Sequence, residues 1–343
     1  RDKLVTGVQT CALPIYMHSN DFIGKFGQIC VTLFLFTGGY GIYISSKKRT
    51  FNIFNNIKKL FESYWKVFFV MIPIAYIFFS KQSAYCNNTA ISTTYSVFSF
   101  NTILSNLLSL SSSLNSEWWF IHYYLIVIIL FPFIKKLFSK NSLQFNIFLI
   151  VIIHILLTCV FPAIGNIKEL GMLKNNFYYR EFFMNNSKYT SCFLLGMLFA
   201  KEDLFVKLKK KYNESIKFSI LSDIIVIGII VYLRVIVIGY QFDLISIPFL
   251  SIVFLDLVKR FKILVNMFSF FGKHSTNMWL THTFFCYYFG FFSKIVTFFR
   301  WPILCLIVLI LLSLGMSILI DYFWKNIFKL YNFLQNKFKR VSN

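Results

Sequence analysis

A succession of long apolar segments constrains this chain more than any other feature. Polar residues gather between these segments, and a run of about 20 apolar residues is long enough to cross a bilayer. Only 14% of the 343 residues are charged, against about 25% in an ordinary soluble domain. The sequence therefore predicts an all-α, polytopic transmembrane helix bundle. Nine segments are expected, at approximately residues 27–45, 63–80, 117–135, 145–162, 187–200, 217–237, 242–258, 274–296 and 301–324.

The charge distribution predicts how the segments are oriented. The formal net charge is +22, and the positive-inside rule accounts for basic residues in alternate loops better than nucleic-acid binding does. The long, Ser-, Asn- and Thr-rich loop 81–116 is expected outside. We therefore expect a multi-pass protein of the plasma membrane, typical of a bacterial inner membrane. The loops expected to face the cytoplasm are 46–62, 136–144, 201–216, 259–273 and the C-terminal tail.

The N-terminal segment differs in character from the rest. Residues 5–15 read VTGVQTCALPI, which looks like an in-frame translation of a sequencing-library adapter. We expect residues 1–15 to be non-native and to lie outside the fold, and residues 16–343 to form one membrane domain. The first of the nine segments is oriented from outside to inside, so the predicted fold has ten helices and lacks the first.

Two ionisable residues near the apolar segments are candidates for chemistry. His282 lies about eight residues into its expected segment, and an ionisable side chain inside a membrane is a functional hypothesis by default. Glu117 opens a segment beside Trp118 and is either a favourable charge at a helix N-terminus or a site acid. The stretch Gly272–Ser275 reads as a loop that enters a helix, with Ser275 as the N-cap.

Other polar residues have simpler interpretations. Arg234 lies near the outer end of its segment and is expected to snorkel. It lies roughly 16 Å along the helix from Asp223, too far to pair with it. Asp243, near a segment end, is expected to be solvated or paired there. For His154 a structural hydrogen bond is favoured, and for His122 a place in the interfacial aromatic belt.

The sequence lacks the motifs of several common classes of enzyme and transporter. The sequence contains no P-loop, GxSxG or HExxH pattern, which argues against an ATP-driven pump and against a familiar hydrolase. The cysteines and histidines show no metal-ligand spacing, so no metal and no disulfide framework is expected.

Four blocks of sequence resemble the acyltransferase 3 family of integral membrane acyltransferases. The first, Gly27–Tyr40 (GQICVTLFLFTGGY), is similar to the family's Gly-x-x-x-Val-x-x-Phe-Phe-x-x-Ser-Gly-Tyr helix. The second runs from Trp119 to Pro132, and the third is Phe193–Met197 (FLLGM). The fourth, Gly272–His282 (GKHSTNMWLTH), resembles a Gly-x-x-Ser-x-x-x-Tyr-Leu-x-His block. The family's ten-helix plan agrees with nine observed segments plus one missing.

The resemblance implies transfer of an acyl group, commonly acetyl, from cytoplasmic acyl-CoA to a hydroxyl of a glycan or lipid-linked sugar. It also implies a catalytic histidine where the first and second helices meet, for which His18 is the candidate, although the family's upstream arginine is absent. Together with His282 and Glu117, His18 completes the predicted catalytic set. The family's two-arginine basic motif is matched only in part here, because Lys59 fits the second arginine and Asn56 does not fit the first; Lys58 is the neighbouring cation that could compensate.

The predicted donor-binding residues are basic and lie at the cytoplasmic ends of the first two segments. Lysine binds phosphate as a point charge, without the bidentate fork of arginine. The predicted set is Lys47, Lys48, Arg49, Lys58 and Lys59.

Two other functions fit a polytopic protein. A polysaccharide flippase or other transporter needs a polar path with charges near the midplane, and few charges lie there. A glycan polymerase would carry arginines in a large external loop, and loop 81–116 has none.

Overall fold

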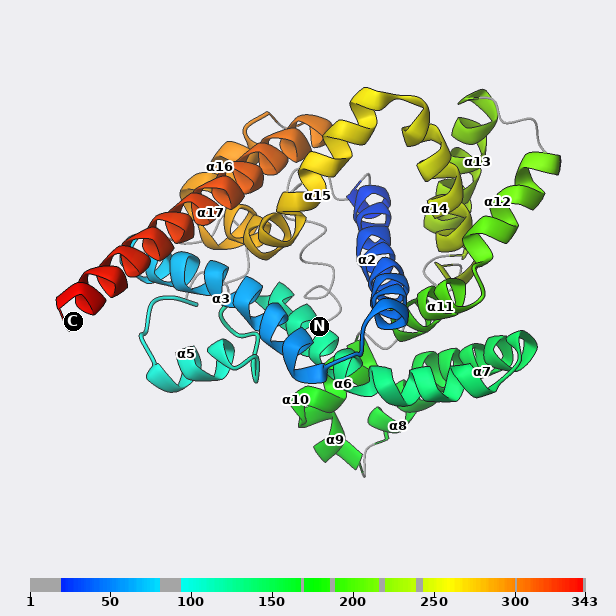
Figure 1. Cartoon of the computed structure of the whole chain (residues 1–343), viewed down its shortest axis with the longest axis horizontal. Helices are drawn as coiled ribbons and strands as arrows, with labels where there is room; N and C mark the ends of the chain where they lie inside the picture. The colour runs from blue at the N-terminus through cyan, green and yellow to red at the C-terminus, as the bar shows by residue number, and fades with distance from the viewer. Residues whose placement is uncertain are drawn as a thin grey trace. The chain divides into compact units, whose positions relative to one another are not determined.

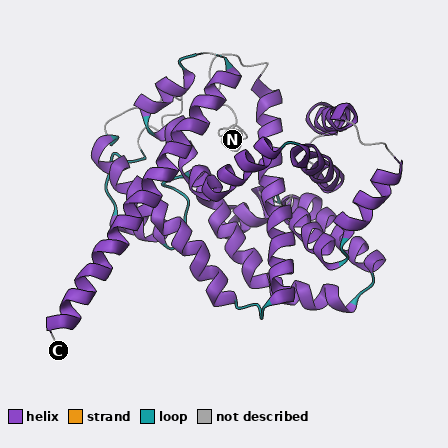
Figure 2. Cartoon of the chain, turned by 45° about the horizontal axis from the view of Figure 1, so that its top comes forward, coloured by secondary structure: helices purple, strands orange, loops and turns teal. Residues whose placement is uncertain are grey.

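The computed structural model describes residues 20–80, 94–167, 170–185, 189–215, 220–238, 243–299 and 301–341. These residues form helices joined by loops and turns, with no strand among them (Figure 2), so the predicted all-α class is confirmed. The chain divides into two compact units. Unit 1 holds the described residues of Tyr16–Asn56 and Tyr123–Asn266, and unit 2 holds those of Ile57–His122 and Met267–Asn343.

Figure 1 labels the helices in chain order. Those lying wholly or mainly in unit 1 are α2 (Asn20–Lys48), α6 (Trp119–Lys140), α7 (Leu143–Ile155), η2 (Leu156–Val160), α8 (Phe161–Gly165), α9 (Gly171–Asn175), α10 (Phe177–Tyr179), η4 (Arg180–Asn185), α11 (Thr190–Lys201), α12 (Leu204–Ser215), α13 (Ile220–Tyr232), η6 (Leu233–Ile238) and α14 (Asp243–Arg260). Those lying wholly or mainly in unit 2 are α3 (Ile53–Phe78), α5 (Phe100–Leu107), η1 (Ser116–Trp118), α15 (Lys262–Thr283), η8 (Phe284–Tyr288), α16 (Gly290–Thr297) and α17 (Pro302–Val341).

Several of these helices suit a membrane. Each of the nine predicted segments falls largely in helix, and five helical stretches of the described chain have the length and hydropathy of a span. Two further apolar helices, Thr190–Lys201 and Ile220–Tyr232, are shorter than a span. The five candidate spans are Ile29–Lys48, Ile53–Phe78, Ser116–Lys140, Leu143–Gly165 and Ile303–Asn336.

Unit 1 is built around a close crossing of α2 and α11. A Cβ atom added to Gly196 would lie 2.0 Å from the carbonyl oxygen of Phe36, and one added to Gly39 would lie 2.1 Å from that of Phe193. The two backbones therefore touch, as small residues allow between membrane helices. Gly39 and Gly196 belong to the first and third family-like blocks, so packing accounts for both glycines.

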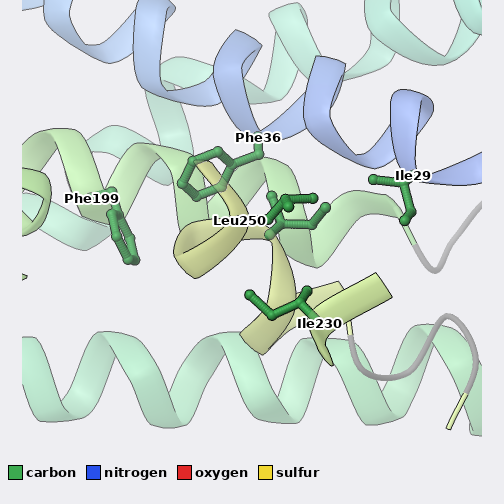
Figure 3. Packing of buried hydrophobic residues seen from close by; sticks show 6 residues of the cluster. Ile29, Phe36, Phe199, Ile230 and Leu250 are labelled. Atoms are coloured by element: carbon green, nitrogen blue, oxygen red, sulfur yellow. The ribbon is translucent and has the colours of Figure 1, made fainter. Parts of the chain in front are cut away.

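A hydrophobic cluster surrounds this crossing (Figure 3). It joins α2 and α11 to the α13–α14 hairpin, and Phe36 packs edge-on against Phe199 with ring centroids 5.3 Å apart. Nearly all of α11 is buried, so this short helix lies in the middle of unit 1. The buried members of the cluster are Ile29, Phe36, Phe199, Ile230, Ile247 and Leu250.

In unit 2 the structure corrects the start of one predicted segment. Gly272–Ser275 is not a loop, because α15 runs without a break from Lys262 to Thr283. Ser275 is not an N-cap either, since its hydroxyl donates to the carbonyl of Gly272, 2.9 Å away within the helix. His282 therefore lies in the last turn of α15, about 30 Å along the axis from its first residue, and not a short distance into a span.

Candidate active site

The end of α15 is joined to the start of α6 by hydrogen bonds within unit 2. Asn115 is the N-cap of η1, and its Oδ1 accepts from the backbone N–H of Glu117 at 3.1 Å. Its Nδ2 donates to the hydroxyl of Thr283 at 2.7 Å. The buried side-chain amide of Asn115 thus bonds both to Glu117 and to Thr283, the residue that follows His282. We call this region, Asn115–Phe120 with Trp279–Thr283, the α6–α15 junction.

Aromatic side chains close the junction. The indole N–H of Trp118 donates to the carbonyl oxygen of Leu280 at 3.1 Å, and Trp118 is almost fully buried. The rings of Phe120 and Trp279 meet at 61° with centroids 5.0 Å apart. These residues come from or adjoin the second and fourth family-like blocks, so the structure brings these two blocks together.

His282 is held in one tautomer by its own helix. Its Nδ1 lies 2.6 Å from the carbonyl oxygen of Trp279. A carbonyl can only accept a hydrogen bond, so Nδ1 carries the proton and Nε2 presents a lone pair. His282 is only partly buried, so the geometry gives this partly accessible imidazole the form that a general base requires.

Glu117 lies at the N-terminal end of η1, directly before α6. A carboxylate there is stabilised by the positive end of the helix dipole. The carboxylate is also close enough to η8 to interact electrostatically with the thiol of Cys286 and the hydroxyl of Tyr288. Glu117 therefore lies at a helix N-terminus, as the first interpretation from sequence expected, and its role as a site acid stays a prediction.

Lys47 at the end of α2 has a partner in unit 1. Its ammonium donates to the carbonyl oxygen of Ala200 at 2.7 Å and lies 3.9 Å from the carboxylate of Asp203. A cation at the last carbonyls of α11 stabilises that helix end. Lys47 is thus engaged by the protein itself, which weakens its predicted role in holding a phosphate.

The other predicted donor-binding residues are exposed. Lys48 and Arg49 follow Lys47 at the surface of unit 1. In unit 2, Lys58 lies 3.9 Å from Glu62 in an exposed pair of the kind that contributes little stability, and Lys59 is exposed beside it. His18 lies outside the described residues.

A buried ion pair in unit 1 decides between the two alternatives expected for Asp243, which is paired and not solvated. Arg234 does not snorkel: its Nε lies 2.9 Å and its Nη2 3.3 Å from the two carboxylate oxygens of Asp243. Thr32 of α2 donates to the same carboxylate at 2.8 Å. All three side chains are buried. Arg234 and Asp243 lie only nine positions apart in the sequence. This closeness was the only sequence feature that could have predicted the ion pair.

Further polar contacts surround the first turn of α11. His154 Nδ1 lies 2.7 Å from the hydroxyl of Ser191, and Tyr123 hydrogen-bonds Thr190. Such contacts hold membrane helices together. In unit 2, His122 is buried and donates from Nδ1 to the carbonyl oxygen of Ser109 at 2.9 Å. Among the described residues, no three His, Cys, Asp or Glu side chains gather as metal ligands would.

Helices able to span a membrane, small-residue helix packing and a polar junction between helix ends define a multi-pass membrane protein. The chain belongs to the acyltransferase 3 family, whose sequence profile, described as an acyltransferase domain, matches residues 9–322. Searches of curated proteins and of solved structures found no match.

Proposed function

We propose that this membrane acyltransferase moves an acyl group from cytoplasmic acyl-CoA to a hydroxyl of a cell-surface or lipid-linked glycan. Acetyl is the group that the family resemblance favours. The observation that carries the proposal is the tautomer of His282, whose Nδ1 is bonded to the carbonyl oxygen of Trp279 and whose Nε2 therefore presents a lone pair. A bacterial inner membrane supplies both sides of this reaction, with CoA inside and glycans outside.

The reaction requires one proton to leave the acceptor hydroxyl. Nε2 of His282 takes that proton as the oxygen attacks the thioester carbonyl, the carbon–sulfur bond breaks, and the proton passes to the CoA thiolate. Glu117 belongs to the same junction and is the carboxylate proposed to stabilise the imidazolium formed on the way. His18 is a second candidate for the same role, and an acyl-histidine intermediate is the alternative chemistry for either imidazole.

The donor is proposed to bind at the cytoplasmic ends of α2 and α3. Only four residues separate these helices along the chain, and the positive-inside rule puts the connection between them on the cytoplasmic side. Lys48, Arg49, Lys58 and Lys59 supply four cations there for the CoA phosphates. Lys47 instead stabilises the end of α11.

The test substitutes each histidine in the full chain and measures transfer from labelled acetyl-CoA to glycan acceptors in membranes. His282→Gln should abolish transfer while the protein remains folded by thermal melting. His274→Gln is the matched control, because His274 lies in the same helix and its Nδ1 contacts Ser317 at 3.0 Å. This variant should retain most of the activity. His18→Ala separates the two candidate bases, since only the true base is indispensable.

Glu117→Gln gives an independent readout. If the Glu117 carboxylate stabilises the charge formed on the base, its removal should lower kcat and leave KM for acyl-CoA unchanged. An unchanged kcat in Glu117→Gln would remove Glu117 from the mechanism, and full activity in His282→Gln would remove the α6–α15 junction.

A further inference from the structure

An apolar groove of about 540 Å³ lies between α3 and α17 in unit 2. Val70 and Ile74 line one wall, and the other wall runs along α17 through Ile320, Phe323 and Ile327. Both helices are candidate spans by length and hydropathy, so we expect the groove to lie at the level of the bilayer hydrocarbon. Its volume is in the range of small-molecule sites, about 300–1,000 Å³, and its lining suits an alkyl chain better than a nucleotide.

Helical spacing places one lysine of each helix next to residues that line this groove. Lys66 precedes Val70 by four residues on α3, so the two side chains share one face of that helix. Lys329 follows the groove residue Asn326 by three residues on α17 and shares its face in the same way. The indole of Trp324 donates to the backbone carbonyl of Lys66 at 2.9 Å, which fixes α3 and α17 at this level.

Two carboxylates lie near these lysines in the sequence, Glu62 and Asp321, and each contacts another side chain. In the described part of the chain, no carboxylate pairs with Lys66 or Lys329. The nearby Asp321 accepts from Asn277 at 3.0 Å, and Glu62 lies beside Lys58. After Asp321 the sequence has five cations and no acid, at Lys325, Lys329, Lys337, Lys339 and Arg340. By the positive-inside rule this end lies at the cytoplasmic leaflet, where anionic lipids attract basic segments.

We propose that the α3–α17 groove binds an anionic phospholipid of the cytoplasmic leaflet. One acyl chain lies along Val70, Ile74 and Ile320, and the phosphate is held by the ammonium groups of Lys66 and Lys329. A zwitterionic lipid binds more weakly, because its own ammonium group is repelled by these lysines. The site is independent of the acyl-transfer chemistry, and it anchors the basic end of α17 at the membrane surface.

The test measures binding of phosphatidylglycerol and phosphatidylcholine to the delipidated full chain by native mass spectrometry. The chain should bind phosphatidylglycerol more tightly. Lys66→Gln/Lys329→Gln should weaken that binding about thirtyfold, from about 1 kcal/mol for each lysine, and should remove most of the preference for phosphatidylglycerol over phosphatidylcholine. Lys207→Gln/Lys210→Gln removes two lysines from α12 in unit 1 and should have no effect.

A second variant tests the groove itself. Val70→Trp fills it without changing the charge and should lower phosphatidylglycerol binding while thermal melting shows a folded protein. Equal affinity for the two lipids, or full binding by the Lys66→Gln/Lys329→Gln variant, would overturn the proposal. Displacement of phosphatidylglycerol by free CoA would also overturn it, because the lysines would then bind the donor's phosphates.

Discussion

The contact between α2 and α11 makes a quantitative prediction for Gly196→Ala. The new Cβ would lie 2.0 Å from the carbonyl oxygen of Phe36, where ordinary contact begins at 3.4 Å. The opposing atoms belong to the α2 backbone, so no side chain can rotate away and the helices must separate by about 1.4 Å. Overpacking of a core costs about 1–3 kcal/mol, and a clash between two backbones falls at the upper end.

At roughly 2–4 °C for each kcal/mol, Gly196→Ala should lower the melting temperature in detergent by about 6–12 °C. Gly41→Ala in α2 is the matched control, because a Cβ there meets no atom within 4 Å. Alanine is the better helix former by about 1 kcal/mol, so this control should melt at the same temperature or higher. Melting of Gly196→Ala within 2 °C of the unchanged chain would refute the close crossing.

Three further predictions concern the polar contacts. Arg234→Met leaves the Asp243 charge buried and unpaired and should cost about 3–5 kcal/mol of stability; adding Asp243→Leu should restore much of the melting temperature, and a harmless single variant would contradict the buried pair. Trp118→Phe keeps a ring but loses the N–H to α15, so stability should fall by about 1 kcal/mol, whereas an unchanged melt would show that this bond contributes nothing. Lys47→Ala should lower the melting temperature and leave KM for acyl-CoA unchanged. Lys48→Ala should raise KM for acyl-CoA in saturation kinetics and leave the melting temperature unchanged. The opposite pattern would show that Lys47 binds the donor and that Lys48 stabilises the fold.

The helices and the all-α class could be predicted from the sequence because a long apolar run in a membrane must satisfy its backbone hydrogen bonds internally, which a helix does. The boundary of α15 could not. Gly272 and its polar neighbours look like a loop, yet the helix continues because His274 and Asn277 find partners at Ser317 and Asp321 on α17. Those partners lie more than 40 residues away, where local sequence patterns carry no information.

The candidate site was predictable only in part. The resemblance identified the blocks that carry His282 and Gly196, but the residues that contact them come from other helices. Arg234 and Asp243 lie nine positions apart in the sequence, Arg234 in the π-helical stretch η6 and Asp243 at the first residue of α14. Asn115 has no motif at all, and only the fold shows that it joins Glu117 to Thr283.

The central claim is that this membrane protein transfers an acyl group from acyl-CoA by base catalysis at the α6–α15 junction. The most direct test reconstitutes the full chain in lipid nanodiscs and follows free CoA thiol and acyl ester on added glycan together. We predict that thiol release and ester formation rise in equal amounts, and that both disappear in His282→Gln. Absence of both products with the unchanged chain, or equal amounts of both with His282→Gln, would contradict the account.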